Sequence, residues 1–134
     1  MGANSEEKGI KISSPVDCDN APKKKILKEF ITAFATKDYT TIIKNSTEDI
    51  SWTIVNDFTV QGTKEVTAVL DKRITKKIKE VDILNMITHG KTAAVNGTIQ
   101  SEDNTNYSFC NVYTFKSAGK NTIKDITTYI IKMD

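Results

Sequence analysis

The sequence has 134 residues, a length typical of a single domain, and 38% of them are hydrophobic. Its 19 basic and 17 acidic residues leave a formal net charge of +2, which argues against nucleic acid as a main partner because phosphate binding needs a concentrated basic surface. No apolar run approaches the ~20 residues that span a bilayer, so we expect no membrane partner.

The first twenty residues are polar, contain Pro15 and show no sustained hydrophobic period. Segments of this kind cannot bury enough apolar surface to order themselves. We therefore predict a flexible N-terminal tail over residues 1–20 and one folded domain over residues 21–134.

The middle of the chain predicts three helices and two strands. Pro22 suits the first turn of a helix whose apolar residues recur at helical spacing, and Asp38 can cap a second, short helix. A β-rich run at residues 50–55 and a short strand at 58–60 precede a third helix over about residues 63–77. The apolar stripe of the first helix consists of Ile26, Leu27, Phe30, Ile31 and Phe34.

The last third of the chain predicts four long strands joined by short turns. Asn96-Gly97 is a common hairpin signal, but here it has apolar residues on both sides, and turns stand a strand length away in each direction. We interpret it as a strand interior or a bulge. The four strands are expected at residues 78–88, 92–100, 106–116 and 122–133.

Helices grouped first and antiparallel strands grouped afterwards are typical of an α+β fold. A strongly bent sheet that folds around three helices makes a cone with an open mouth. Cavities of that kind are where small ligands usually bind.

Several segments, in the same order along the chain, resemble the SnoaL-like branch of the NTF2-like superfamily. They correspond to that family's first helix and its exit, the acidic entry to its first strand, the opening of its third helix, and its last two strands. The segments are residues 28–38, 47–52, 61–65, 111–115 and 123–129. The resemblance covers about residues 21–134 and implies a cystatin-like cone, with three N-terminal helices packed on a strongly bent, mainly antiparallel sheet.

The family that the sequence resembles includes steroid isomerases, polyketide cyclases, dehydratases and epoxide hydrolases. The isomerase-type site needs an aspartate base on the first strand, a tyrosine on the first helix and a protonated acid on the penultimate strand. Those places hold Ile54, Phe30 and Asn111 here. The base and the tyrosine are therefore absent, and Asn111 can donate a hydrogen bond but cannot be the protonated acid.

Alternation along the penultimate strand places Phe109, Asn111 and Tyr113 on one face, which the cone fold makes concave. Trp52 is the sole tryptophan, and its indole could either pack in the core or form a cavity wall with its N–H aimed at a ligand. We expect a small, mostly apolar molecule to bind in the cone without dedicated catalysis. The predicted ligand-binding residues are Phe30, Trp52, Ile54, Phe109, Asn111 and Tyr113.

Two other functions remain open. An enzyme of the isomerase, cyclase or dehydratase type would need an acid–base group, for which His89 with Asp57 or Asp125 are the candidates, although His89 and Asp57 are more simply turn residues. A structural or protein-interaction module is the second alternative. Because the long strands carry apolar residues on both faces, we expect a homodimer through the open sheet.

Residue types that bind metals are scarce. His89 is the only histidine, and Cys18 and Cys110 do not form a metal-binding spacing such as CxxC. We predict no metal site and no cofactor. Residues 1–8 lack the apolar segment of a secretory signal, which favours a reduced, cytoplasmic location.

Overall fold

The computed structural model describes residues 2–15 and 21–134, which form three helices and eight strands. In chain order these are β1 (Gly2–Glu7), β2 (Ile10–Pro15), α1 (Pro22–Thr36), α2 (Tyr39–Lys44), β3 (Ser46–Ile54), β4 (Phe58–Gln61), α3 (Thr63–Arg73), β5 (Ile78–His89), β6 (Thr92–Ser101), β7 (Asn106–Phe115) and β8 (Ile123–Lys132). No helix in this part of the chain is long and apolar enough to cross a membrane.

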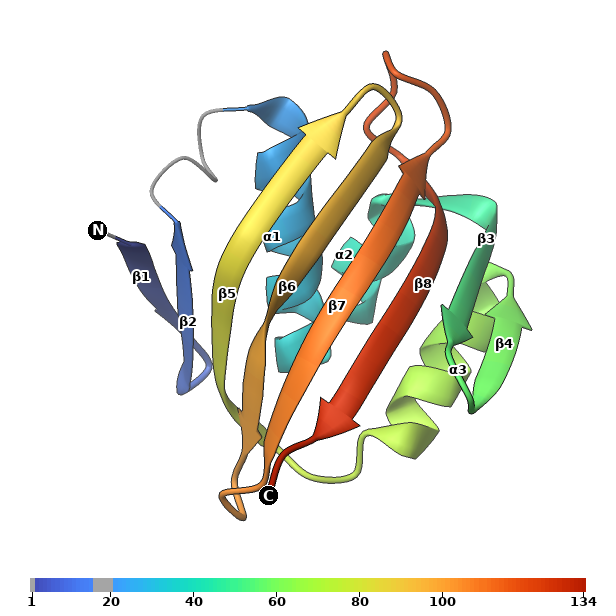
Figure 1. The fold of residues 1–134 in the computed structure, drawn as a ribbon. Helices are drawn as coiled ribbons and strands as arrows, with labels where there is room; N and C mark the ends of the chain where they lie inside the picture. The colour runs from blue at the N-terminus through green and yellow to red at the C-terminus, as the bar shows by residue number, and fades with distance from the viewer. Residues whose placement is uncertain (1, 16–20) are drawn as a thin grey trace.

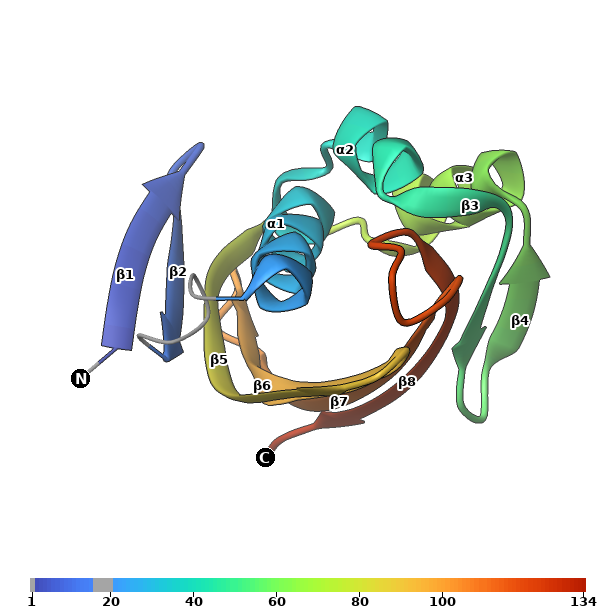
Figure 2. The same cartoon turned by 90° about the horizontal axis from the view of Figure 1, so that it is seen from above.

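The strands form one sheet in the order β1-β2-β5-β6-β7-β8-β3-β4, with β1 and β4 at its two edges (Figure 1). Five of the seven strand pairs are antiparallel, while β2 with β5 and β3 with β8 are parallel. The sheet is therefore mainly antiparallel, as the sequence predicted. Seen from above, β5 to β8 curve around α1, so that the helix lies against the concave face (Figure 2).

The apolar stripe of α1 explains this contact, because Leu27, Phe30 and Ile31 are buried on the side that faces the sheet. The helix ends where Lys37 adopts a left-handed conformation with φ of 58°. Asp38 then caps α2, as predicted, because its carboxylate accepts a hydrogen bond from the backbone N–H of Thr41 across 3.2 Å.

The third helix is shorter than predicted. It ends at Arg73, where the backbone N–H of Ile74 donates the last helical hydrogen bond to Leu70. The basic residues at 76 and 77, which the sequence placed at the end of this helix, lie in the segment that leads into β5.

The N-terminal residues differ most from the sequence-based prediction. Residues 2–15 are not an unstructured tail but a hairpin, and β2 pairs in parallel with β5. Ile12 lies opposite Val81, and both side chains are fully buried. The burial of Ile10 and Ile12 against the sheet supplies the apolar contact that the polar composition concealed. Residues 16–20, which include Cys18 and the predicted domain boundary, lie outside the described residues.

The pairing of β5 with β6 contains a bulge. The register shifts between Ile83 and Asn85, opposite Asn96 and Gly97, so the Asn96-Gly97 pair lies inside a strand next to a bulge, as predicted. A Cβ atom at Gly97 would lie 2.2 Å from the carbonyl oxygen of Asp82. Only glycine therefore allows the two backbones to approach this closely.

Candidate functional site

A small cavity of about 60 Å³ lies between α1 and the concave face of the sheet, and we call it the inner cavity. It is lined by all six of the residues that the sequence predicted as ligand-binding. These are Phe30, Trp52, Ile54, Phe109, Asn111 and Tyr113. Helix α1 contributes the first of them, and the strands β3 and β7 contribute the others.

Aromatic rings form much of its wall. The ring of Phe30 on α1 lies 5.7 Å from that of Trp52 and meets the ring of Tyr113 edge-on at 6.4 Å, measured between centroids. Phe34, one helical turn further along, lies 6.1 Å from Trp52. Aromatic pairs prefer tilted and edge-on contacts of this kind, and here they join α1 to the sheet at the wall of the inner cavity.

The indole N–H of Trp52 is not aimed at free space. It donates a hydrogen bond to the hydroxyl oxygen of Thr128 on β8 across 2.8 Å, and both side chains are buried. The interpretation of this N–H as a ligand donor is therefore wrong, while the position of the indole in the cavity wall agrees with the sequence. Thr128 also lines the inner cavity and was missed. The period of two along β8 places it on the same face as Ile126 and Ile130 and could have revealed it.

Asn111 and Tyr113 form the polar end of the inner cavity. The side-chain N–H of Asn111 donates to the hydroxyl oxygen of Tyr113 across 2.9 Å. Asn111 is only 9% exposed, and its side-chain oxygen Oδ1 has no hydrogen-bond partner among the described residues. Burial raises the pKa of the Tyr113 hydroxyl well above its ordinary value, so this group stays protonated at neutral pH.

A larger hollow of about 310 Å³, which we call the outer basin, adjoins the inner cavity. The two share Phe34, Ile99 and Ile130, whose side chains separate them. The outer basin extends along the segment from Arg73 to Ile78, at the end of the sheet that carries the C-terminus (Figure 1). The inner cavity and the outer basin are therefore neighbours that share part of their walls.

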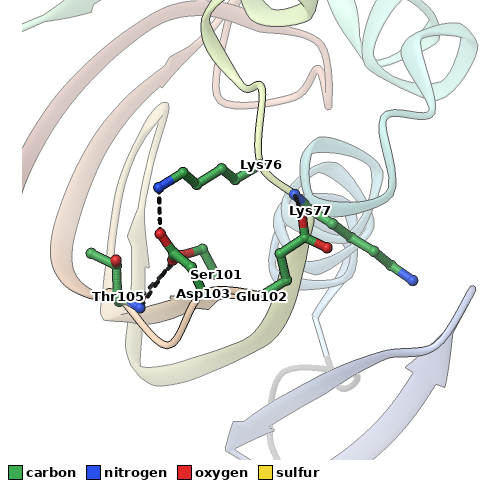
Figure 3. Close-up of polar contacts among 6 residues, drawn as sticks. All are labelled: Lys76, Lys77, Ser101, Glu102, Asp103 and Thr105. Carbon is green, nitrogen blue, oxygen red and sulfur yellow. Dashed lines mark hydrogen bonds and ion pairs between the residues drawn. The ribbon is translucent and has the colours of Figure 1, made fainter.

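At one side of the outer basin, a cluster of polar side chains joins the α3–β5 segment to the β6–β7 turn (Figure 3). The carboxylate of Asp103 accepts hydrogen bonds from Lys76, from the hydroxyl of Ser101 and from the backbone N–H of Thr105. These donors, with Lys76 first among them, hold the pKa of Asp103 well below its usual range. Lys76 and Ser101 both line the outer basin, so the cluster fixes part of its edge.

The candidate acid–base residues lie elsewhere. Asp57, in the turn between β3 and β4, is exposed and pairs with Arg73 across 3.1 Å. His89 is exposed and is the last residue of β5, which begins at Ile78. Asp125 is exposed on β8. None of the three lines the inner cavity. The described residues also contain no group of three or more His, Cys, Asp or Glu that could hold a metal ion.

No family model matches the sequence, and no curated protein matches it significantly. Solved structures do resemble it. An NTF2-like protein of unknown function from Burkholderia xenovorans LB400 is 12% identical, with a TM-score of 0.72, and 84% of each chain is covered.

A provisionally assigned SnoaL-like polyketide cyclase from Shewanella denitrificans OS-217 is 15% identical, with a TM-score of 0.69 over 83% of this chain and 92% of that one. A de novo designed protein with a curved β-sheet is 16% identical, with a TM-score of 0.69 over 81% and 84%. At these identities the likeness establishes the fold alone. The chain has the NTF2-like fold that the sequence resemblance predicted.

Proposed function

We propose that this protein binds a small, mostly apolar molecule in the inner cavity, without a dedicated acid–base reaction. The composition of the cavity wall carries the proposal. The lining side chains that carry a hydroxyl or amide group are those of Asn111, Tyr113 and Thr128, and the others are aliphatic, phenyl or indole groups. None is an acid, a histidine, a lysine or an arginine. Ligand sites typically combine such an apolar wall with a few polar groups that fix orientation.

The volumes indicate how such a molecule would be accommodated. The inner cavity alone, at about 60 Å³, is much smaller than the ~300–1,000 Å³ of typical small-molecule sites. The adjoining outer basin, at about 310 Å³, brings the combined space into that range. We infer that one end of the ligand enters the inner cavity and that its remainder lies in the outer basin, within the cone that the family resemblance implies.

The fluorescence of Trp52 offers a direct test, because it is the only tryptophan and it lines the inner cavity. We expect some members of a library of small apolar molecules to change this fluorescence and to raise Tm, since a ligand that binds only the folded state stabilises it. If no molecule changes either signal, the proposal is wrong.

A pair of variants distinguishes binding in the cavity from binding elsewhere. Ile54→Phe adds atoms to the wall of the inner cavity and should weaken binding of any molecule found. Leu84→Phe makes the same type of change at a side chain that is about half exposed on β5 and should leave binding unchanged. Equal effects of the two substitutions would place the bound molecule outside the inner cavity.

The enzymatic alternative has less support than binding. A general base must lie within hydrogen-bond reach of the proton that it removes. His89 and Asp57 lie outside the inner cavity, and the raised pKa of Tyr113 makes that side chain a poor base.

We further propose that a second copy of the chain covers the outer face of the sheet. Large apolar side chains are exposed on β5, β7 and β8, with Ile87 and Ile131 each 65% exposed. Leu84, Val112 and Tyr129 are further exposed apolar side chains on these strands. Exposed apolar patches on a sheet often mark an interface.

Sedimentation velocity tests the dimer. We expect a dimer at micromolar concentration, which Ile131→Lys should dissociate by placing a charge in the interface. Val55→Lys introduces the same charge at an exposed apolar residue of the β3–β4 turn and should leave the dimer intact. A purely monomeric wild-type protein would contradict this proposal.

A further inference from the structure

The polar end of the inner cavity specifies more than an apolar ligand. We propose that the bound molecule carries a neutral hydroxyl group, held between the side chains of Asn111 and Tyr113. This inference rests on the proposed function, because it concerns the same cavity and names the chemical class of its ligand.

The hydrogen bonds of the two side chains leave one acceptor and two donors unused, since the Asn111 amide nitrogen carries a second N–H beside the unused hydroxyl hydrogen of Tyr113. Asn111 donates from Nδ2 to the Tyr113 oxygen across 2.9 Å, which leaves its Oδ1 without a partner although it is buried. The described residues give the hydroxyl hydrogen of Tyr113 no acceptor either. Buried polar atoms are nearly always hydrogen-bonded in native proteins, so this pair is incomplete without a further molecule.

The requirement does not depend on which way the amide is turned. With the amide reversed, Tyr113 would donate to Oδ1, and Nδ2 of Asn111 would become the unused donor. The tyrosine oxygen would then be the unused acceptor. Either arrangement presents an unused acceptor beside at least one unused donor, and a hydroxyl group, which both donates and accepts, can satisfy one of each.

Other oxygen-containing groups fit less well. A ketone accepts but does not donate, so it would leave the acceptor of the pair unsatisfied. A carboxylate would bring a negative charge into a cavity with no lysine, arginine or histidine in its wall, and burial of an unpaired charge is strongly unfavourable. The cations nearest to the outer basin, Arg73 and Lys76, are already paired with Asp57 and Asp103.

The remainder of the molecule is expected to be apolar. The inner cavity has room for only a few atoms beside the hydroxyl group, and the boundary with the outer basin consists of Phe34, Ile99 and Ile130. An alkyl chain or a hydrophobic ring attached to the hydroxyl would contact these three side chains.

Three probes of equal length test the proposal: octanol, methyl hexyl ketone and octanoate. Each is titrated into the wild-type protein while the fluorescence of Trp52 is recorded, with isothermal titration calorimetry as a second measurement. We expect octanol to bind at least about tenfold more tightly than either competitor, since leaving a buried partner unsatisfied typically costs a factor of this size or more.

A double variant assigns the preference to the two side chains. Asn111→Leu combined with Tyr113→Phe removes both polar groups with little change of shape and should lower octanol affinity about tenfold, with less than about threefold change for the ketone. Asn85→Leu combined with Tyr129→Phe is the matched control, because neither side chain lines the inner cavity or the outer basin. The control should preserve the wild-type order of affinities.

The outcomes separate this inference from the proposed function. If octanol and the ketone bind the wild-type protein equally well, the hydroxyl inference is wrong while binding of apolar molecules stands. If the ketone or octanoate binds more tightly than octanol, the inference is also wrong. If none of the three binds and no library member does so, the proposed function fails as well. The wild-type comparison decides the matter even if the double variant does not fold.

Discussion

The indole nitrogen of Trp52 lies 2.8 Å from the hydroxyl oxygen of Thr128, and this hydrogen bond joins β3 to β8 across the wall of the inner cavity. The two strands are also paired in parallel, with Trp52 opposite Ile126 and Ile54 opposite Thr128. The hydrogen bond allows a large indole to be buried without an unsatisfied N–H. It also fixes the ring plane that Phe30 and Phe34 contact.

Thr128→Val should therefore destabilise the protein by about 1–3 kcal/mol, because valine keeps the shape but leaves the Trp52 N–H buried without an acceptor. Thr127→Val is the matched control: it makes the same change at the neighbouring position, which is less buried, and should shift stability by less than about 0.5 kcal/mol. Urea unfolding followed by circular dichroism measures both. Equal decreases of the free energy of unfolding in the two variants would show that this hydrogen bond does not contribute to stability.

Asn111 and Tyr113 should behave as a coupled pair. Tyr113→Phe leaves the Asn111 amide without its partner, and Asn111→Leu leaves the buried Tyr113 hydroxyl without a donor, so each should cost about 1–3 kcal/mol. The double variant removes both polar groups and should cost less than the sum of the two. A double-mutant cycle measures the difference, which is typically about 0.5–3 kcal/mol for residues in contact. Simple additivity would contradict the pairing.

Tyr113 should make the protein lose stability at alkaline pH. Its folded-state pKa is raised above the ordinary value of 10.0 by burial. A raised pKa means that the stabilising contribution is complete below about pH 10 and is lost as pH rises above it, because the unfolded chain then releases a proton that the folded chain retains.

The measurement compares urea unfolding of the wild-type protein and of Tyr113→Phe from pH 8 to pH 11. The wild-type protein should lose up to ~1.4 kcal/mol per pH unit more than the variant above pH 10. Ultraviolet absorbance of phenolate provides an independent readout, since Tyr113 should ionise only on unfolding. Parallel pH profiles for the two proteins would contradict a buried, protonated Tyr113.

Asp103 should make the protein lose stability at acidic pH. Its folded-state pKa is lowered, so its contribution is present above the ordinary value of 3.8 and is lost as pH falls below it. Asp103→Asn should thus lower Tm more at pH 7 than at pH 2. Asp49→Asn, which makes the same substitution at an exposed position on β3, is measured beside it as the control. An equal decrease of Tm at both pH values would show that the charge of Asp103 is unimportant.

The residues of the inner cavity were predictable because their signals are local. Alternation along one strand puts Phe109, Asn111 and Tyr113 on the same face, and helical spacing puts Phe30 in the stripe that covers it. Neither rule says which face of the sheet is concave. That information came from the family resemblance, and the structure agrees with it.

Thr128 was missed although the period of two along β8 places it with Ile126 and Ile130, and the β1–β2 hairpin was missed because its pairing partner is distant in the sequence. Thr128 is a threonine in a run of threonines and isoleucines, and its partner Trp52 lies 76 residues away. Among the hairpin side chains whose burial is described, only Ile10 and Ile12 are both apolar and buried, and the hairpin pairs in parallel with a strand that follows much later in the chain. Sequence propensity is a weak guide where tertiary pairing decides the outcome.

The end of α3 illustrates a different limit. The basic residues up to 77 suit the last turn of a helix, where they complement the helix dipole. In the structure Lys76 instead pairs with Asp103 of the β6–β7 turn. The sequence pattern is compatible with both arrangements, and only the distant turn distinguishes them.

The absence of a side chain at Gly97 has a consequence for how the proposed binding site could change. Gly97 lies opposite Phe109, a residue of the cavity wall, and its backbone approaches that of Asp82 too closely for even a methyl group. A substitution there would force β5 and β6 apart and shift Phe109 with them. A substitution at position 97, which does not line the inner cavity, would therefore change the shape of the proposed binding site. A survey confined to the lining residues would overlook this position.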